Sequence, residues 1–237
     1  DSASRGLGDV YKRQDLMNSL SNDNFSNENF RFSTAKFISI EDTKIWTQRL
    51  SYVGELGYEL YVEVKDAKKI YELIVNKGKD FNLSNCGMHA MDIMRMESGF
   101  LHWGHDISPE ENQYQAGLSF TISNKKNVDF IGKKALEKID KKKIKTRFAM
   151  FTLKDSKPGE PLLLHDEPIY LKDQIIGKST SGNYSFNFKK NLTFGYISND
   201  FSNEQLKNSE LFIEVEKKKY EIEVINGPLK QTNFKSN

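Results

Sequence analysis

Cysteine is almost missing from this sequence, since Cys86 is the only one in 237 residues. One cysteine cannot form an internal disulfide, and it is too few for a zinc site built from several cysteines. A chain of this length can bury enough apolar surface for one large or two small domains without such cross-links. The shortage of cysteine favours a reducing compartment, so we expect the cytoplasm, or the mitochondrial matrix in a eukaryote.

Long hydrophobic runs and an excess of charge are missing too. No apolar stretch approaches the roughly 18 residues that a membrane-spanning helix needs, and the first residues lack the basic-then-apolar pattern of a signal peptide. The 35 Lys and Arg residues nearly balance the 33 Asp and Glu residues, for a formal net charge of +2. The lysine clusters at Lys125-Lys126 and Lys141–Lys145 therefore read as solvated faces. We expect neither a membrane nor a nucleic acid as a partner.

Several catalytic signatures are absent. The sequence has no Gly-x-Ser-x-Gly elbow, no phosphate-binding loop and no Gly-x-Gly-x-x-Gly fingerprint. Cys86 has only His89 as a nearby basic partner, which gives little support for a nucleophile. His102, His105 and Asp106 are close in sequence, but no second histidine-rich segment completes a metal site. We therefore predict no metal and no nucleophilic catalysis.

The first fourteen residues, DSASRGLGDVYKRQ, differ from the remainder of the chain. They are rich in Gly, Ser and Arg, whereas later basic residues are mostly Lys. We interpret residues 1–14 as a non-native, linker-like segment and leave it out of the fold prediction. Because the chain also lacks an initial Met, we expect the native protein to begin further upstream and this sequence to be a C-terminal fragment.

Residues 15–143 mix strand and helix patterns. The alternation of Leu60 and Val62 with Glu59 and Glu63 is typical of a half-buried strand. Asp66 is in position to cap a helix that Gly78 ends. The predicted strands are 32–40, 45–50, 58–64 and 118–122, and the predicted helices are 66–77, 88–98 and 133–139.

After the run Lys141–Lys143, which we take as a domain boundary, short strands dominate. They are expected at 147–153, 161–164, 167–171, 175–181, 192–197, 211–216 and 220–225. Regular short strands of this kind predict a small antiparallel barrel or sandwich over residues 144–237. The fold class is therefore α+β.

The stretch LSYVGELGYELYV, residues 50–62, places Glu55 between two glycines and two tyrosines. A carboxylate there can approach a flat heterocycle and accept two parallel N–H bonds from an amino-pyrimidine edge. Tyr52 and Tyr58 could supply the walls of such a pocket. The alternative is a hairpin loop that carries an exposed acid, and the spacing leaves both interpretations open.

Several blocks together resemble a known family. RLSYVGELGYELYV, GMHAMDIMRMESGFLHWGHDISPEENQYQAGLSF and FIGKKAL are similar to the folate-binding region shared by the glycine cleavage T-protein and the dimethylglycine and sarcosine dehydrogenases. The later GKSTSGNYSFNFKKNLTFGYIS is similar to the C-terminal barrel of that family. LSNDNFSNENFRF and the His-Trp-Gly-x-Asp-Ile run at His102–Ile107 resemble the dehydrogenase branch. The resemblance covers the chain from about Asp15 almost to its end.

The resemblance implies a partial folate-binding domain at residues 15–143 and a barrel domain at 144–237. It implies that Glu55 holds the pterin ring of tetrahydrofolate, with Tyr52, Tyr58 and Trp103 as wall residues and Tyr184 near the folate tail. The catalytic Asp of the family would lie outside this sequence, so no catalytic residue is assigned. Met91 stands where T-proteins commonly have an Arg, which puts one contact to the folate tail in doubt.

The implied function is the tetrahydrofolate-binding portion of a flavoenzyme that demethylates an N-methyl amine and passes the one-carbon unit to tetrahydrofolate. FAD is expected only on a domain upstream of this chain, and the fragment alone is expected to be inactive. One alternative is a stand-alone aminomethyltransferase, which would lack an upstream dinucleotide-binding fingerprint. Another is a non-catalytic folate-binding protein of iron–sulfur cluster assembly, but the Lys-Gly-Cys motif of those relatives is replaced here by Lys126-Asn127-Val128.

Overall fold

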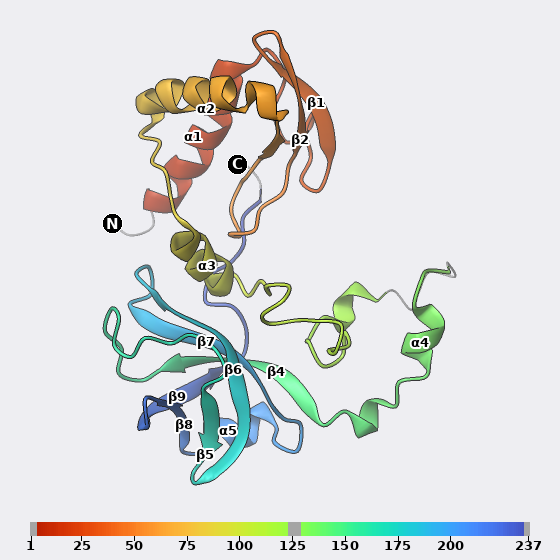
Figure 1. Ribbon diagram of the computed structural model, residues 1–237, viewed down its shortest axis with the longest axis vertical. Helices are drawn as coiled ribbons and strands as arrows, with labels where there is room; N and C mark the ends of the chain where they lie inside the picture. The colour runs from red at the N-terminus through yellow and green to blue at the C-terminus, as the bar shows by residue number, and fades with distance from the viewer. Residues whose placement is uncertain (1–3, 123–128, 235–237) are drawn as a thin grey trace. The chain divides into compact units, whose positions relative to one another are not determined.

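The computed structural model describes residues 4–122 and 129–234, with side chains described from residue 12 onward. The Lys125-Lys126 cluster, and the side chains of most of the linker-like segment, lie outside the described residues. The chain divides into two compact units (Figure 1). The N-terminal unit comprises Asp1–Ser98 with Lys230–Asn237, and the barrel unit comprises Gly99–Leu229.

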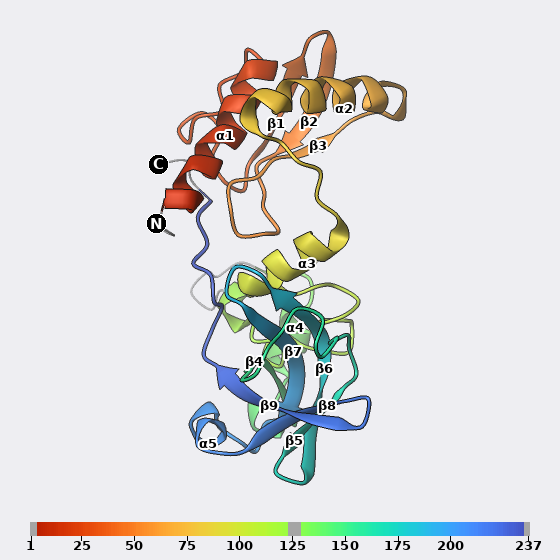
Figure 2. The same cartoon turned by 90° about the vertical axis from the view of Figure 1, so that its left-hand side faces the viewer.

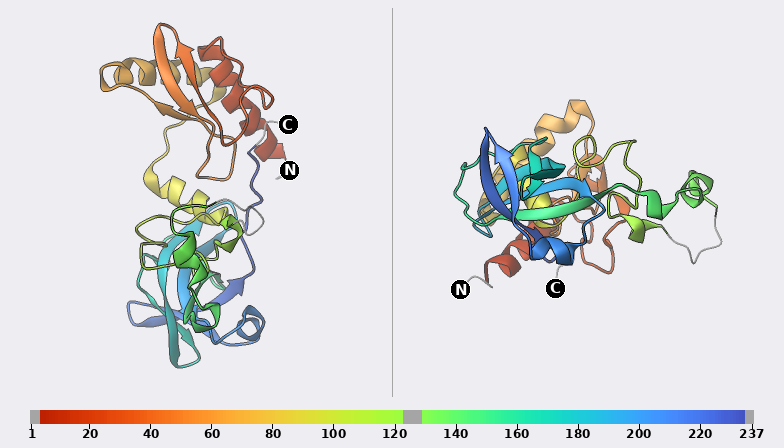
Figure 3. Two further views of the ribbon diagram at one scale, coloured as in Figure 1. Left: turned by 90° about the vertical axis from the view of Figure 1, so that its right-hand side faces the viewer. Right: turned by 90° about the horizontal axis from the view of Figure 1, so that it is seen from below.

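The N-terminal unit is built on a three-stranded antiparallel sheet in the order β1-β2-β3. Helices α1 and α2 cover one face of this sheet (Figures 2 and 3). The helix α3 and a short 3₁₀ turn, η1, complete the unit. The bounds are α1 Ser4–Leu20, β1 Ala35–Ile40, β2 Thr43–Gln48, β3 Glu59–Tyr61, α2 Val64–Gly78, η1 Lys79–Phe81 and α3 Met88–Glu97.

The core of the N-terminal unit lies between the sheet and the two helices. Ile38 and Ile40 of β1 and Ile45 of β2 point to the same face, as the two-residue period of a strand requires. They pack against Met17 of α1 and Ile70 of α2. This burial holds the strands in register, and the register fixes where the loop between β2 and β3 leaves the sheet.

Three predictions for this unit need correction at the ends of elements. Helix α2 begins at Val64, so Asp66 lies in its first turn and is not the cap; an acid there still interacts favourably with the helix dipole. Strand β3 is limited to Glu59–Tyr61 because only Glu59, Leu60 and Tyr61 pair with β2. Strand β1 begins at Ala35, after a loop in which Ser33 adopts a positive φ of 65°.

The barrel unit contains a closed antiparallel barrel in the order β4-β7-β6-β5-β8-β9, which confirms the predicted α+β fold with a small barrel. Closure leaves no strand edge unpaired, which removes the usual route to edge-to-edge association. Its elements are η2 Ser119–Thr121, α4 Lys133–Glu137, η3 Lys141–Lys143, β4 Thr146–Leu153, β5 Pro168–Leu171, β6 Gln174–Ser185, β7 Lys190–Ser198, α5 Asn203–Lys207, β8 Leu211–Val215 and β9 Lys218–Ile225.

Two strands predicted in this unit do not form. Residues 118–122 make a 3₁₀ turn, and residues 161–164 make a loop with no ladder partner. Leu163 of that loop is nonetheless buried against the barrel core, and a Cβ atom on Gly182 of β6 would come within 2.3 Å of its Cβ. The apolar character of residues 161–164 therefore reflects core packing and not strand pairing.

Candidate functional site

The loop between β2 and β3 carries Glu55 and is folded by its own polar groups. The Ser51 hydroxyl accepts hydrogen bonds from the backbone N–H groups of Val53 (3.3 Å) and Glu55 (3.1 Å). Gly54 adopts a φ of +73°, and a Cβ atom there would lie 2.2 Å from the Ser98 hydroxyl oxygen. The loop is therefore a specific structure that presents Glu55, and not a minimal hairpin turn.

The Glu55 carboxylate is held between two cations. Arg13 Nη2 lies 2.5 Å from Oε2, and Lys230 Nζ donates to Oε1. Arg13 also donates from Nη1 to the Leu56 carbonyl at 2.8 Å. The Glu55 side chain is 22% exposed. Burial acts to raise the pKa of Glu55, but the hydrogen bonds and charges of Lys230 and Arg13 outweigh it and lower the pKa below 4.5.

These ion pairs predict a pH-dependent stability. The folded-state pKa of Glu55 lies below its ordinary value of 4.5. The ionised side chain therefore stabilises the folded chain above about pH 4.5, and this stabilisation is lost as the pH falls through the folded-state pKa. Glu55→Gln should therefore destabilise the chain at pH 7, and the difference from wild type should narrow below pH 4.5. Urea unfolding over a pH series measures this. A difference that stays constant down to about pH 3 would contradict it.

Tyr58 and Tyr52 flank Glu55 in the same loop. The Tyr58 ring packs edge-on against Phe25, with 5.4 Å between ring centroids, and in a tilted arrangement against Phe30, with 5.9 Å between centroids. Its hydroxyl oxygen is buried and has no hydrogen-bond partner in the described part of the chain. Burial raises the pKa of Tyr58 to about 12, against the opposing effect of the Arg49 charge. Tyr58 thus lines the core with an unsatisfied hydroxyl, while Tyr52 is half-buried.

Trp103 and Tyr184 belong to the barrel unit. Trp103 is 66% exposed in the loop that follows α3. Tyr184 lies on β6, with its ring 5.1 Å from that of Phe186 at an interplanar angle of 79°. The structure therefore brings Tyr52, Glu55 and Tyr58 together within one unit and places Trp103 and Tyr184 in the other. Their roles in binding stay predictions.

Arg13 and Lys230 are the site residues that the sequence did not reveal. They lie 42 and 175 residues from Glu55 along the chain. Arg13 falls in the segment that was left out of the fold prediction, and Lys230 follows the barrel. The final segment is fixed to the N-terminal unit by a bond from Lys230 N–H to the Glu97 carbonyl (2.9 Å) and by stacking of Phe234 on Phe32 (4.1 Å). No local pattern marks either cation.

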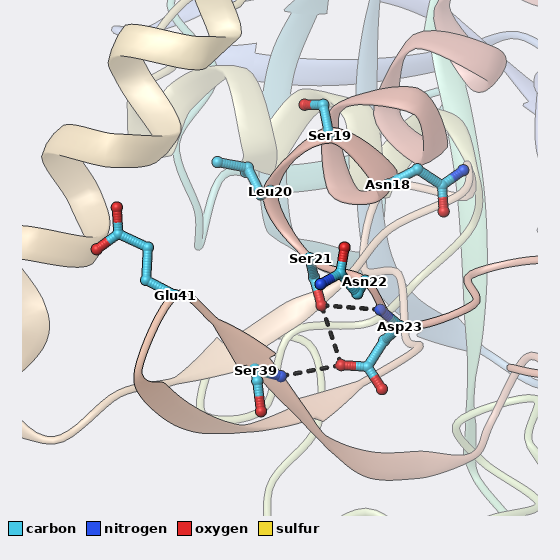
Figure 4. A pocket seen from close by; sticks show the side chains of 8 residues that line it. All are labelled: Asn18, Ser19, Leu20, Ser21, Asn22, Asp23, Ser39 and Glu41. Atoms are coloured by element: carbon cyan, nitrogen blue, oxygen red, sulfur yellow. Dashed lines mark hydrogen bonds between the residues drawn. The ribbon is translucent and has the colours of Figure 1, made fainter.

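A separate, open pocket of about 490 Å³ lies at the C-terminal end of α1 (Figure 4). Its lining is polar, and the Asp23 carboxylate accepts hydrogen bonds from the Ser39 backbone N–H (2.9 Å) and the Ser21 hydroxyl (3.0 Å). These bonds tie the end of α1 to β1. None of the predicted ligand residues lines this pocket, so it gives no support for folate binding at this end of the helix.

Two further properties of the described residues bear on function. None of the helices among them combines the length and apolar character needed to cross a membrane. Within the same part of the chain, no group of three or more His, Cys, Asp or Glu side chains is arranged to hold a metal ion.

A unit with an antiparallel sheet, helices on one face and an acid-bearing loop, followed by a closed six-stranded barrel, defines a two-domain architecture that is found in known proteins. Two protein-family models match the chain: the GCVT N-terminal domain at residues 12–126 and the glycine cleavage T-protein C-terminal barrel domain at residues 147–230. The chain belongs to the glycine cleavage T-protein family. This result confirms the resemblance that the sequence blocks predicted.

Individual relatives extend this assignment. The chain is 33% identical over 225 residues to mitochondrial dimethylglycine dehydrogenase of Rattus norvegicus, covering 94% of this chain and 25% of that protein. It is 38% identical over 173 residues to 4-methylaminobutanoate oxidase (formaldehyde-forming) of Paenarthrobacter nicotinovorans, covering 73% and 21%. The structure of aminomethyltransferase T of the Bartonella henselae glycine cleavage system superposes with a TM-score of 0.73 at 19% identity, covering 92% of this chain and 57% of that one.

These numbers have two consequences. The structural likeness, at 19% identity, supports the fold alone. The chain spans about a quarter of the length of the dehydrogenase and about a fifth of that of the oxidase. The family assignment places the chain among folate-dependent one-carbon transfer proteins.

Proposed function

We propose that this chain is the tetrahydrofolate-binding portion of an enzyme that demethylates an N-methyl amine and passes the one-carbon unit to tetrahydrofolate. The dehydrogenase and the oxidase described above are both named for oxidation of N-methylated amino acids. Their similarity to this chain favours the dehydrogenase branch over a stand-alone aminomethyltransferase. An upstream flavin domain in the complete protein, and a setting in the cytoplasm or the mitochondrial matrix, are part of this proposal.

The ionised Glu55 carboxylate is the observation that carries the proposal. A pterin ring presents an amino-pyrimidine edge with two parallel N–H donors, and a carboxylate is the matching acceptor. Arg13 and Lys230 each use one acceptor position on a different oxygen. Since a carboxylate has about four lone-pair sites, both oxygens keep room for a further donor. The residues present therefore fit the ligand without loss of either ion pair.

Each part of the loop has a definite task in this scheme. Tetrahydrofolate would supply the nucleophilic nitrogen that takes up the one-carbon unit. Glu55 would fix the orientation of the pterin edge, and the two cations would keep Glu55 charged while it is partly withdrawn from water. Tyr52, Tyr58 and Trp103 are proposed as aromatic wall residues, and Tyr184 is proposed as a contact of the folate tail.

Isothermal titration with 5-formyltetrahydrofolate tests the proposal. Wild-type chain should bind it saturably, and Glu55→Gln should weaken binding by about 10- to 100-fold, because a hydrogen bond to a charged group contributes about 1.5–3 kcal/mol. Glu59→Gln, a change in an exposed acid on β3, should leave the affinity unchanged.

A second control separates the ligand contact from damage to the loop. Lys230→Met removes one of the two ion pairs but keeps the carboxylate. Equal loss of affinity in Lys230→Met and Glu55→Gln would mean that loop structure, and not the acid itself, governs binding. If the folded wild-type chain does not bind the folate, the proposal is wrong for this chain on its own.

A further inference from the structure

A second cavity lies wholly within the barrel unit, on the outer surface of the barrel. It has a volume of about 550 Å³, inside the usual range for small-ligand sites. Strands β6 and β7 and the start of β4 form its floor, and the loops at residues 104–111 and 165–166 form its sides. The lining residues are Gly104, His105, Glu111, Thr146, His165, Asp166, Gly177, Lys178, Ser179, Thr180 and Tyr196.

Tyr196 of β7 is the central side chain of this cavity. Its neighbour Ile197 belongs to the barrel core, so Tyr196 points to the opposite, outer face. Its ring packs against Phe148 of β4 with centroids 5.9 Å apart, and Lys178 of β6 is its direct cross-strand partner. The Tyr196 hydroxyl oxygen is buried and has no hydrogen-bond partner in the described part of the chain. Since this oxygen has no accessible surface, Tyr196 lines the cavity with its ring and not with its hydroxyl.

Negative charge surrounds this hydroxyl. Burial, followed by the charges of Glu111 and Asp106, raises the pKa of Tyr196. Glu111 uses its Oε2 atom to accept hydrogen bonds from the Ser108 backbone N–H (2.8 Å) and hydroxyl (2.6 Å). None of the described Lys, Arg or His side chains forms an ion pair with Glu111. One carboxylate oxygen beside the Tyr196 ring thus remains open to a donor.

Two basic side chains of the cavity, Lys178 and His165, are already engaged by Asp166. Lys178 Nζ lies 2.5 Å from Asp166 Oδ1, and His165 Nδ1 lies 2.9 Å from Asp166 Oδ2. Asp166 therefore neutralises Lys178 and fixes one nitrogen of His165. Because Asp166 is paired with Lys178, the carboxylate left without an ion pair among the lining residues is that of Glu111. The cavity consequently favours a cation over an anion.

We infer that this cavity binds a small organic ammonium ion, whose N–H group donates to Glu111 while its charge lies against the Tyr196 ring. A protonated amine supplies only donors, which matches the Glu111 carboxylate oxygen that the cavity leaves open. The aromatic face adds cation–π attraction. The site lies outside the Glu55 loop and does not depend on the proposed folate function.

NMR titration of the ¹⁵N-labelled chain with dimethylammonium chloride, at constant ionic strength, tests the inference. Saturable shifts are expected at backbone amides of residues 104–111, 177–180 and 196. The Kd should be about 1 mM at best, because so few atoms contact the protein. Tetramethylammonium, which has no N–H group, should bind more weakly. Sodium acetate should leave these amides unmoved.

Two variants assign the contacts. Glu111→Gln should weaken dimethylammonium binding by about tenfold, the effect of losing one charge-assisted hydrogen bond. Tyr196→Leu should weaken binding several-fold because it removes the ring, whereas Tyr196→Phe keeps the ring and should bind nearly as wild type. Tyr170→Phe, on β5 and outside the cavity lining, is the matched control and should bind as wild type. Saturation by acetate in place of dimethylammonium, no saturable shift, or normal binding by Glu111→Gln would overturn the inference.

Discussion

Replacing Arg49 by Met is expected to lower the free energy of unfolding of the N-terminal unit by about 3–5 kcal/mol. Arg49 is 1% exposed, and its guanidinium donates to the Phe30 carbonyl, to Asn27 Oδ1 and, at 3.0 Å, to the Phe234 carbonyl. Met keeps much of the volume but donates nothing, so the three acceptors lose the hydrogen bonds from the guanidinium. The same change removes the bond to Phe234, at the end of the segment that carries Lys230. It should therefore also weaken the ion pair between Lys230 and Glu55.

Urea unfolding followed by circular dichroism measures this loss. Arg31→Met is the matched control, because Arg31 is exposed and the hydrogen bonds from Thr34 reach its backbone carbonyl, which the substitution keeps. The control should stay within about 0.5 kcal/mol of wild type. Equal stability of the Arg49 and Arg31 variants would show that the buried guanidinium does not organise this unit.

Replacing Gly177 by Ala should destabilise the barrel by about 3 kcal/mol, as an overpacked core does. A Cβ atom at this position would lie 2.0 Å from the Tyr196 carbonyl oxygen and 2.7 Å from Ile197 Cα, both backbone atoms of β7. Strands β6 and β7 approach too closely here for any side chain, which is a recognised reason for glycine within a strand. The strands would have to separate, so the cavity beside Tyr196 should be disturbed as well.

Thermal or urea unfolding of the Gly177 variant gives the measurement. Gly87→Ala provides the comparison, because Gly87 has a φ of −83° and a methyl group added there would meet no atom within 4 Å. A Gly177 variant as stable as the Gly87 variant would contradict the close approach of the two strands.

The sequence pattern predicted most of the barrel because each barrel strand has one face in the core. Strands β4 and β7 contribute Phe151, Leu153 and Ile197 to the core, and their sequences are correspondingly apolar. The spans predicted for these two strands fall inside the observed ones. The pattern was wrong at residues 161–164 because burial of Leu163 gives a loop the same apolar signature as a strand. It was wrong at 118–122 because hydrogen bonds from residues 121 and 122 back to 118 and 119 close a turn there.

Only the local part of the candidate site could be predicted from the sequence. Gly54 and Gly57 marked the loop because both positions exclude a side chain: a Cβ atom on Gly57 would lie 2.7 Å from the Leu50 carbonyl oxygen. The acid between them followed from the same pattern. The cations that pair with Glu55 could not be predicted, since Arg13 and Lys230 reach it only through the tertiary fold. Ion pairs between residues so far apart in the sequence leave no periodic pattern that could be recognised.

The cavity beside Tyr196 was equally hidden from the sequence. Its lining comes from a loop at 104–111, a loop at 165–166, the hairpin of β6 and β7 and the start of β4, which are separated in the sequence. The nearby histidines His102 and His105 suggested a metal site at most, and no such cluster is present among the described residues. The His102 and His105 rings lie 4.5 Å apart, and the His105 ring lies 6.3 Å from that of His165; of the three, His105 and His165 line the cavity.

The central claim, that Glu55 is a charged anchor for a reduced folate, is tested most directly by carbon NMR of chain labelled with [5-¹³C]glutamate. The Glu55 carboxyl resonance is identified by its absence in Glu55→Gln. On titration with 5-formyltetrahydrofolate, this resonance should shift in a saturable way while that of Glu59 stays in place. At neutral pH its position should remain that of an ionised carboxylate, consistent with its lowered pKa. Saturable folate binding that leaves the Glu55 resonance unmoved would contradict the account.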